Sequence, residues 1–259
     1  MAAAQTWRRL ASAVILAAGL GWSTPSPAIV DWLSDFVVSD EQVYQLGLKS
    51  FEEIKQQEKI ADDRAAQRRV QEIGRRIVQA SDSTIPADQW EFVVFDSDQI
   101  NAFALPGGRV GVYTGLIDIA ESDDQLAAVI GHEIAHVTQG HAKERITTGI
   151  GTNALVSGAS ALIGGENPVT QQIADTILGA GAEFGVARPF GRGQESEADT
   201  VGLRYMAEAG YNPHAAVEFW QNMTQAKGGA GGLPAWLSTH PADQARINAL
   251  KQEIKAMGY

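Results

Sequence analysis

The chain has 259 residues, of which 44% are hydrophobic, so it can bury one sizeable core. Its formal net charge is −11, which disfavours nucleic-acid binding because an acidic surface repels phosphate. The absence of cysteine excludes disulfides, cysteine-ligated zinc and a cysteine-linked lipid anchor, and leaves histidine and carboxylate side chains as the strong metal ligands.

Residues 1–28 have the composition of a secretory signal peptide. Two arginines precede an apolar run over residues 10–20, and a small-x-small sequence ends at Ala28. The run is about half of the ~20 residues that a membrane span needs, so an uncleaved anchor is the less favoured alternative. Cleavage would leave residues 29–259, which we expect to form a single domain in a periplasm or, in a photosynthetic source, a thylakoid lumen.

The next part of the chain predicts helices followed by a small sheet. Apolar residues recur at three- and four-residue steps over residues 39–80, which indicates two or more amphipathic helices. Residues 90–95 read as a strand, and residues 101–113 as a hairpin that turns at Pro106 and Gly107. An edge strand of such a sheet can align an extended substrate by main-chain pairing, although an ordinary hairpin that feeds the core is equally consistent.

Residues 122–147 are predicted to form one helix that carries the sequence His-Glu-x-x-His. At 3.6 residues per turn, His132 and His136 lie one above the other, which is the geometry that two imidazoles need to bind one Zn²⁺. Glu133 follows the first histidine directly. Its carboxylate would point beside the metal, where it can take a proton from the attacking water.

Residues 149–187 are rich in glycine and alanine, and Asn167 and Pro168 are suited to begin a helix within them. A helical hairpin that packs within the domain is favoured over membrane contact, because neither arm is a continuous apolar span of ~20 residues.

Residues 194–202 open another helix, in which Glu195 and Asp199 share one face while Glu197 points elsewhere. A carboxylate from a second helix is the usual third ligand of a catalytic zinc site, so Glu195 is the candidate. Asp199 would orient a ligand imidazole by accepting its other N–H. Taken alone, these acids could be an ordinary negatively charged first turn of a helix.

The chain near His240 follows a glycine-rich stretch, residues 227–233, that is expected to be flexible. Pro241 is suited to begin the last helix, so His240 is expected at that helix's N-terminus. A histidine there is often a cap or a surface residue, but the loop before it makes it a candidate for moving onto and off the metal.

Four motifs occur in order along the chain: NAFALPGG at 101–108, HEIAH at 132–136, ESEAD at 195–199 and STHP at 238–241. Together they resemble the HtpX-like and CAAX-prenyl-protease-like zinc metallopeptidases, most of all the soluble exported members of the BepA and Oma type. The resemblance covers about residues 40–257. Unlike the integral-membrane members, the chain has no second long apolar span, and unlike the BepA type it ends without a helical-repeat region, so we expect a stand-alone protease domain.

The resemblance implies that His132, His136 and Glu195 bind the metal, that Glu133 is the general base and that Asp199 is the supporting aspartate.

It also implies a role for His240, which in such proteins either ligates zinc as a fourth, blocking ligand or helps to hold the oxyanion. Arg246 matches a family arginine near the active site, with an exposed helix charge as the alternative.

We therefore predict an α+β fold: a mostly helical, zincin-like metalloprotease domain with a small β-sheet, an active-site helix and one Zn²⁺ per chain. The predicted function is that of a zinc-dependent endopeptidase in envelope protein quality control, which cleaves exported proteins that are misfolded or membrane-associated. Autoinhibition by His240 is part of this expectation. The alternative is a zinc-stabilised chaperone or binding module with little proteolysis, which Glu133 argues against. The partners are polypeptide substrates, with peripheral membrane or envelope-protein contact left open; the sequence indicates no oligomeric state.

Overall fold

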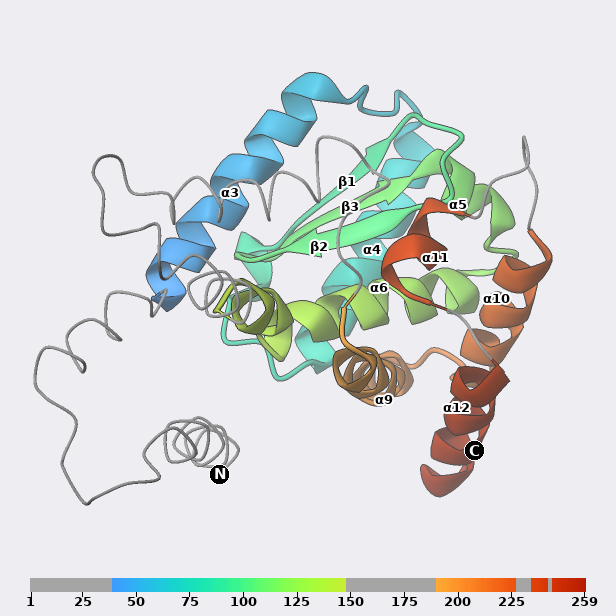
Figure 1. The fold of residues 1–259 in the computed structure, drawn as a ribbon. Coiled ribbons are helices and arrows are strands. Elements are labelled where there is room, and N and C mark those ends of the chain that lie inside the picture. Colours follow the sequence, from blue (N-terminus) through green and yellow to red (C-terminus); the bar gives the residue numbers. More distant parts are fainter. Residues whose placement is uncertain (1–38, 148–189, 227–233, 242–243) are drawn as a thin grey trace, which may run out of the picture. The chain divides into compact units, whose positions relative to one another are not determined.

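The computed structural model describes residues 39–147, 190–226, 234–241 and 244–259, all in one compact unit. The predicted signal peptide, the segment 149–187 and the loop 227–233 lie outside the described residues. The described elements, drawn in Figure 1, are α3 (Asp40–Gln57), α4 (Arg64–Ala80), η1 (Ala87–Gln89), β1 (Glu91–Phe95), β2 (Ala102–Leu105), β3 (Arg109–Tyr113), α5 (Thr114–Ile119), α6 (Asp123–Thr138), α9 (Arg192–Glu208), α10 (His214–Gln225), α11 (Ala235–Thr239) and α12 (Gln244–Ala256).

The three described strands form one sheet in the order β1-β3-β2. β2 and β3 are antiparallel, as the predicted hairpin requires, and Gly107 and Gly108 in the turn have φ of +83° and +73°. β1 pairs with β3 in parallel, in the register Val94 to Val112. β2 is therefore an edge strand of this sheet. The helices and the sheet confirm the predicted α+β class.

The two faces of the sheet bury different side chains. On one face, Phe51 of α3 packs edge-on against Phe95 and Phe103, with ring centroids 6.3 and 6.2 Å away. The opposite face packs against α4 and α6 in the main core, whose largest contributors from these elements are Phe92, Val94, Val110, Val112, Val70, Ile73, Ile77, Leu126, Ile130 and Ile134. The sheet is thus covered on both faces, and α6 lies in the middle of the core.

Two glycines set how closely α6 and α9 approach each other. A Cβ atom added at Gly202 of α9 would lie 2.8 Å from the backbone nitrogen of His132, and one added at Gly131 of α6 would lie 3.0 Å from the carbonyl oxygen of Gly202. Such distances exclude any larger residue without a shift of backbone. The middle of α9 is therefore held directly beside the backbone of α6 at His132.

The helix that carries His-Glu-x-x-His is shorter than predicted. α6 ends at Thr138, and the predicted span 122–147 is wrong because Gly140 adopts φ of +70° and ends the helix. The Gly140 N–H donates to the carbonyl of Val137 at 3.1 Å, and a new helical stretch begins at His141. His141 therefore does not continue the α6 spiral.

The backbone before His240 forms an additional helix. His240 lies directly after α11, a short helix that the sequence did not predict, and α12 is described only from Gln244. The His240 N–H donates to the carbonyl of Trp236 at 2.8 Å, so it closes the last turn of α11. His240 is consequently held by α11.

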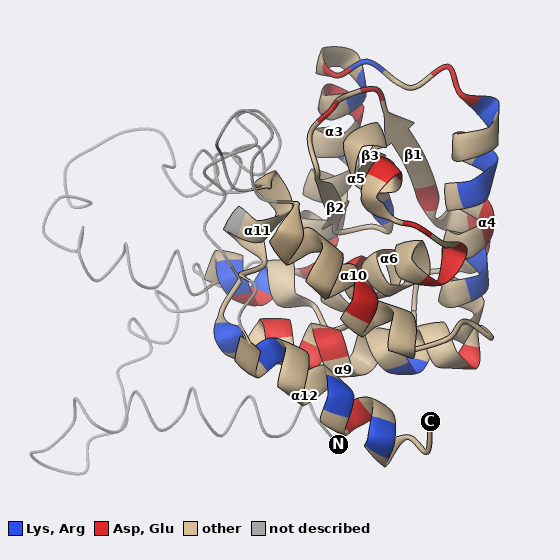
Figure 2. Cartoon of the chain, turned by 90° about the vertical axis from the view of Figure 1, so that its right-hand side faces the viewer, with Lys and Arg blue, Asp and Glu red and all other residues tan. Residues whose placement is uncertain are grey.

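Charged side chains are unevenly distributed over the described surface. Five arginines lie along α4, which is marked by blue segments in Figure 2. Arg69 pairs with Asp123 at 2.6 Å, and Arg76 donates to the carbonyl of Ala209 at 2.6 Å, so part of this basic face fastens α4 to its neighbours. Among the described helices, none has the length and the apolarity that a membrane crossing requires.

Candidate metal centre

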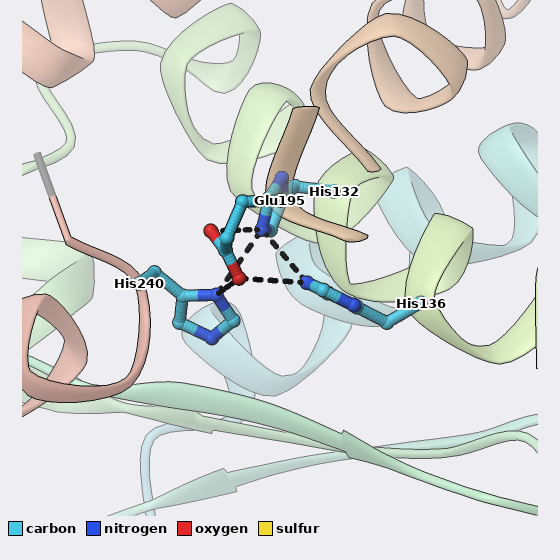
Figure 3. Close-up of side chains that lie close together, drawn as sticks. All are labelled: His132, His136, Glu195 and His240. Atoms are coloured by element: carbon cyan, nitrogen blue, oxygen red, sulfur yellow. Dashed lines mark hydrogen bonds and ion pairs between the residues drawn. The ribbon is translucent and has the colours of Figure 1, made fainter. Parts of the chain in front are cut away.

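Two histidines on α6 direct a ring nitrogen toward the same point in the interior (Figure 3). His132 and His136 are 4% and 2% exposed, and their Nε2 atoms lie 3.0 Å apart. The four-residue spacing places both rings on the face of α6 that meets α9, because residues i and i+4 lie above one another on a helix.

Glu195, near the start of α9, adds a carboxylate to this pair. It is 5% exposed; its Oε1 lies 3.5 Å from His136 Nε2, and its Oε2 lies 3.6 Å from His132 Nε2. The close crossing of the two helices at their glycines brings this carboxylate within reach of both histidines.

His240 completes the cluster from the end of α11. Its Nδ1 lies 3.2 Å from His132 Nε2 and 2.9 Å from Glu195 Oε1, and the residue is 2% exposed. The structure therefore brings together all four residues that were predicted as metal ligands, from three helical segments far apart in sequence.

The four donor atoms have the spacing of a tetrahedral site. Zinc binds imidazole nitrogen and carboxylate oxygen at 2.0–2.2 Å, which places neighbouring ligand atoms roughly 3.3 Å apart. With Glu195 Oε1 as the carboxylate donor, four separations between donor atoms lie between 2.9 and 3.5 Å, and all four donors lie within 4.8 Å of one another. Lone pairs of three imidazoles and a carboxylate thus converge on one buried point, and this donor set fits one zinc ion.

The surroundings favour ligand protonation states that bind a cation. Burial holds the pKa of His136 well below its usual value, so this imidazole is neutral at physiological pH. Burial alone would raise the pKa of Glu195, but the neighbouring histidines, His240 first, bring this pKa below its ordinary value. A neutral imidazole and an ionised carboxylate are the forms that coordinate a metal.

Asp199 and Arg246 form a second layer behind His132. Asp199 Oδ1 lies 3.0 Å from His132 Nδ1, so an Nδ1–H on His132 donates to it and leaves the Nε2 lone pair for the metal. Arg246 donates to both oxygens of Asp199, at 2.6 and 2.8 Å, and its Nη1 lies 2.6 Å from Glu195 Oε2. Burial would raise the pKa of Asp199, but the hydrogen bond with His132 and the charge of Arg246 outweigh it and lower the pKa.

Glu133 lies beside the cluster without joining it. The residue is 2% exposed, and its Oε1 accepts a hydrogen bond from the Trp236 indole N–H at 2.9 Å. The same oxygen lies 3.4 Å from His240 Nε2. Both of these contacts come from α11 and the residue that follows it, so α11 reaches the predicted base as well as the metal ligands.

Comparison with known proteins places this arrangement in a family. The profile of peptidase family M48 matches residues 64–254, which include every one of the site residues above. The chain belongs to peptidase family M48. This M48 chain is 35% identical to the mitochondrial metalloendopeptidase OMA1 of Schizosaccharomyces pombe over 164 residues, which are 63% of this chain and 46% of the relative. It is 30% identical to the metalloprotease LoiP of Escherichia coli over 183 residues, which are 70% of this chain and 69% of the relative.

A putative beta-barrel assembly-enhancing protease of Vibrio cholerae is 29% identical over 227 residues, which are 86% of the M48 chain and 46% of that relative. The chain thus spans less than half the length of this protein and of the yeast OMA1.

Two residues of the M48 site were missed by reasoning from the sequence. Trp236 was missed because its hydrogen bond to Glu133 depends on how α11 folds back over α6. His141 was missed because five residues along a continuous helix would turn it about 140° away from His136. In the structure, His141 Nδ1 lies 2.8 Å from His136 Nδ1, and burial lowers the pKa of His141. The only sequence signal was Gly140, which can end a helix.

Proposed function

We propose that this chain is a zinc-dependent endopeptidase that hydrolyses internal peptide bonds of polypeptide substrates. The observation that carries the proposal is the buried carboxylate of Glu133 next to a four-donor metal cluster. A purely structural zinc site is complete with four protein ligands, so it needs no additional carboxylate such as that of Glu133 beside it. A zinc peptidase, in contrast, needs a base beside the metal to activate water.

In the proposed mechanism the protein's own side chains bind the metal, orient its ligands and transfer the protons. Bound zinc would supply a Lewis acid that polarises the scissile carbonyl and acidifies the attacking water. Glu133 takes the proton of that water and passes it to the leaving amine, as a general base and then a general acid. Asp199 and Arg246 keep His132 in the tautomer that faces the metal.

The described arrangement is a closed form of such an enzyme. A catalytic zinc site uses three protein ligands and leaves the fourth position for water or substrate. Here the His240 ring lies against His132 and Glu195, and we propose that it takes the fourth position. Trp236 simultaneously engages the carboxylate of Glu133. We propose that His240 and Trp236 limit the resting activity while α11 is in this position. Displacement of α11 would then free the metal and the base Glu133 together.

The edge of the sheet supplies a place for an extended substrate. β2 has one unpaired edge in the described sheet and packs against α6. The backbone N–H of Trp236 donates to the carbonyl of Ile100, just before β2, at 3.1 Å. A polypeptide that pairs with this edge by main-chain hydrogen bonds would pass the metal cluster. Because α11 is fastened beside β2, substrate entry and release of His240 are expected to be linked.

Incubation of the purified protein with unfolded casein tests both parts of this proposal. We expect new internal termini by mass spectrometry, and we expect His240→Ala, assayed with saturating zinc, to cleave about tenfold faster than the unchanged protein. A tenfold gain corresponds to removal of a closed state that is favoured by ~1.4 kcal/mol. His214→Ala is the matched control, because His214 is exposed on α10 away from the cluster.

The other outcomes of this assay are equally informative. Loss of cleavage in His240→Ala alone would contradict the blocking role and assign His240 to the oxyanion. If neither protein cleaved casein, the peptidase proposal would be wrong. The site would then fit a zinc-stabilised binding module, because structural zinc sites typically have four protein ligands.

We further propose that the substrates are exported proteins that are misfolded or associated with the cell envelope. The name of the Vibrio cholerae relative, a putative beta-barrel assembly-enhancing protease, supports an envelope role. The composition of residues 1–28 supports export to the periplasm and a mature chain of residues 29–259. N-terminal sequencing of the protein from its native host tests the cleavage after Ala28.

A further inference from the structure

A second hydrogen-bonded chain lies behind the metal cluster, on the side of His136. His136 Nδ1 lies 2.8 Å from His141 Nδ1, and His141 Nε2 lies 3.5 Å from Glu197 Oε2. Both histidines are buried, at 2% and 1% exposure, while the Glu197 side chain is 56% exposed. The chain therefore runs from the metal cluster through two buried rings to a carboxylate at the surface.

The break in the helix at Gly140 creates this chain. The left-handed conformation of Gly140 ends α6 and turns the backbone, so that His141 returns toward His136. A Cβ at Gly140 would meet no atom within 4 Å, so the glycine is required for its φ of +70° and not for space. Gln194 of α9 then donates to the His141 carbonyl at 3.4 Å and to Glu144 at 2.9 Å, which fastens the turn to α9.

The positions of the protons follow from the geometry. A neutral imidazole carries one N–H and one lone pair. His136 turns its Nε2 lone pair toward the metal cluster, so its proton is on Nδ1 and is donated to His141 Nδ1. His141 Nδ1 is then an acceptor, and its own proton is on Nε2, which faces Glu197. Each ring has one tautomer that satisfies its neighbours.

The two ligand histidines of α6 thus have acceptors of different kinds. His132 donates directly to the buried carboxylate of Asp199, which Arg246 neutralises. Within the described part of the chain, His136 has no carboxylate at its Nδ1, and His141 takes that place. The Phe190 ring also stacks on His136, with centroids 3.9 Å apart, so stacking is a competing explanation for the orientation of the His136 ring.

We propose that His141 is a positioning residue of the metal centre: it accepts the Nδ1 proton of His136, holds that ring with Nε2 toward the metal, and is itself held in the required tautomer by Glu197. The proposal rests on the zinc site proposed above. Residues that orient a metal-binding histidine in this way typically contribute 10- to 100-fold to metal affinity.

Two substitutions of His141 separate the acceptor from the packing. His141→Leu keeps a side chain of similar size without an acceptor, whereas His141→Asn places an amide oxygen near the position of Nδ1. Zinc affinity, measured by competition with a chromophoric chelator, should fall by about 10- to 100-fold in His141→Leu and by less than about threefold in His141→Asn. Equal affinity of His141→Leu and the unchanged protein would overturn the proposal and leave stacking on Phe190 as the orienting contact.

Nuclear magnetic resonance of the unchanged, zinc-loaded protein gives a test that needs no variant to fold. The ¹⁵N shifts should show His136 protonated at Nδ1, and His141 protonated at Nε2 with a free Nδ1 lone pair. A proton on His141 Nδ1 would overturn the proposal. A protein that binds zinc and shows these tautomers but cleaves no peptide would contradict only the proposed peptidase function, so the two failures are distinguishable.

Discussion

A Glu133→Gln variant should retain its zinc and lose between about 10²- and 10⁴-fold of its peptide cleavage, which is the usual contribution of a positioned acid–base group. The amide cannot take a proton from water, but its Oε1 can still accept the hydrogen bond from Trp236. Glu133 is also outside the four-donor cluster, so the metal ligands stay complete. Casein cleavage and zinc content per chain, measured on the same preparation, check both halves of this expectation.

Glu218→Gln is the matched control for this substitution, because Glu218 lies exposed on α10 and away from the cluster. Its cleavage rate should equal that of the unchanged protein. If Glu133→Gln cleaved casein at the unchanged rate, another group would have to be the base. If it lost its zinc, the loss of activity would carry no information on proton transfer, and Glu133 would be assigned to the metal shell instead.

Removal of zinc should lower the melting temperature by about 10 °C. Zinc present at about 1,000 times its dissociation constant stabilises the folded state by ~4 kcal/mol, and each kcal/mol shifts the melting temperature of a domain of this size by roughly 2–4 °C. The physical reason is that, once the chelator has removed the zinc, three buried imidazoles and a buried carboxylate still converge on one point but no longer have a cation to bind. Calorimetry with and without a chelator measures the shift.

Glu195→Ala provides the comparison for this experiment. It removes one of the four ligands, so added zinc should raise its melting temperature far less than that of the unchanged protein. Glu208→Ala, at the other end of α9, should respond to zinc as the unchanged protein does, because Glu208 lies a further thirteen residues along the helix (about 20 Å) from the cluster. A melting temperature that does not change when zinc is removed would place the bound zinc outside the buried cluster.

Helical periodicity explains why much of the site could be predicted. The spacing of His132 and His136, and that of Glu195 and Asp199, are local patterns that depend only on 3.6 residues per turn, and the structure brings these residues together. His240 was a candidate because it follows a glycine-rich stretch, and the family motif implied its role at the metal. The structure places its Nδ1 in the cluster, but from α11, which the sequence did not predict.

Contacts between distant elements could not be predicted in the same way. The hydrogen bond between Trp236 and Glu133 joins residues 103 positions apart and depends on the packing of α11 over α6. The contact of His141 with His136 depends on a single residue, since Gly140 is tolerated within a helical pattern and only its left-handed φ shows that the helix ends there. Close approach of α6 and α9 likewise follows from where Gly131 and Gly202 meet in three dimensions.

Direct evidence on the metal ligands would come from the zinc shell itself, which we propose is formed by His132, His136, Glu195 and His240. X-ray absorption spectroscopy at the zinc edge of the purified protein tests it directly. We expect one zinc per chain with three imidazole nitrogens and one carboxylate oxygen at about 2.0–2.2 Å, and the loss of one imidazole in His240→Ala. A zinc shell with fewer than three imidazoles, or one that is unchanged in His240→Ala, would overturn this assignment.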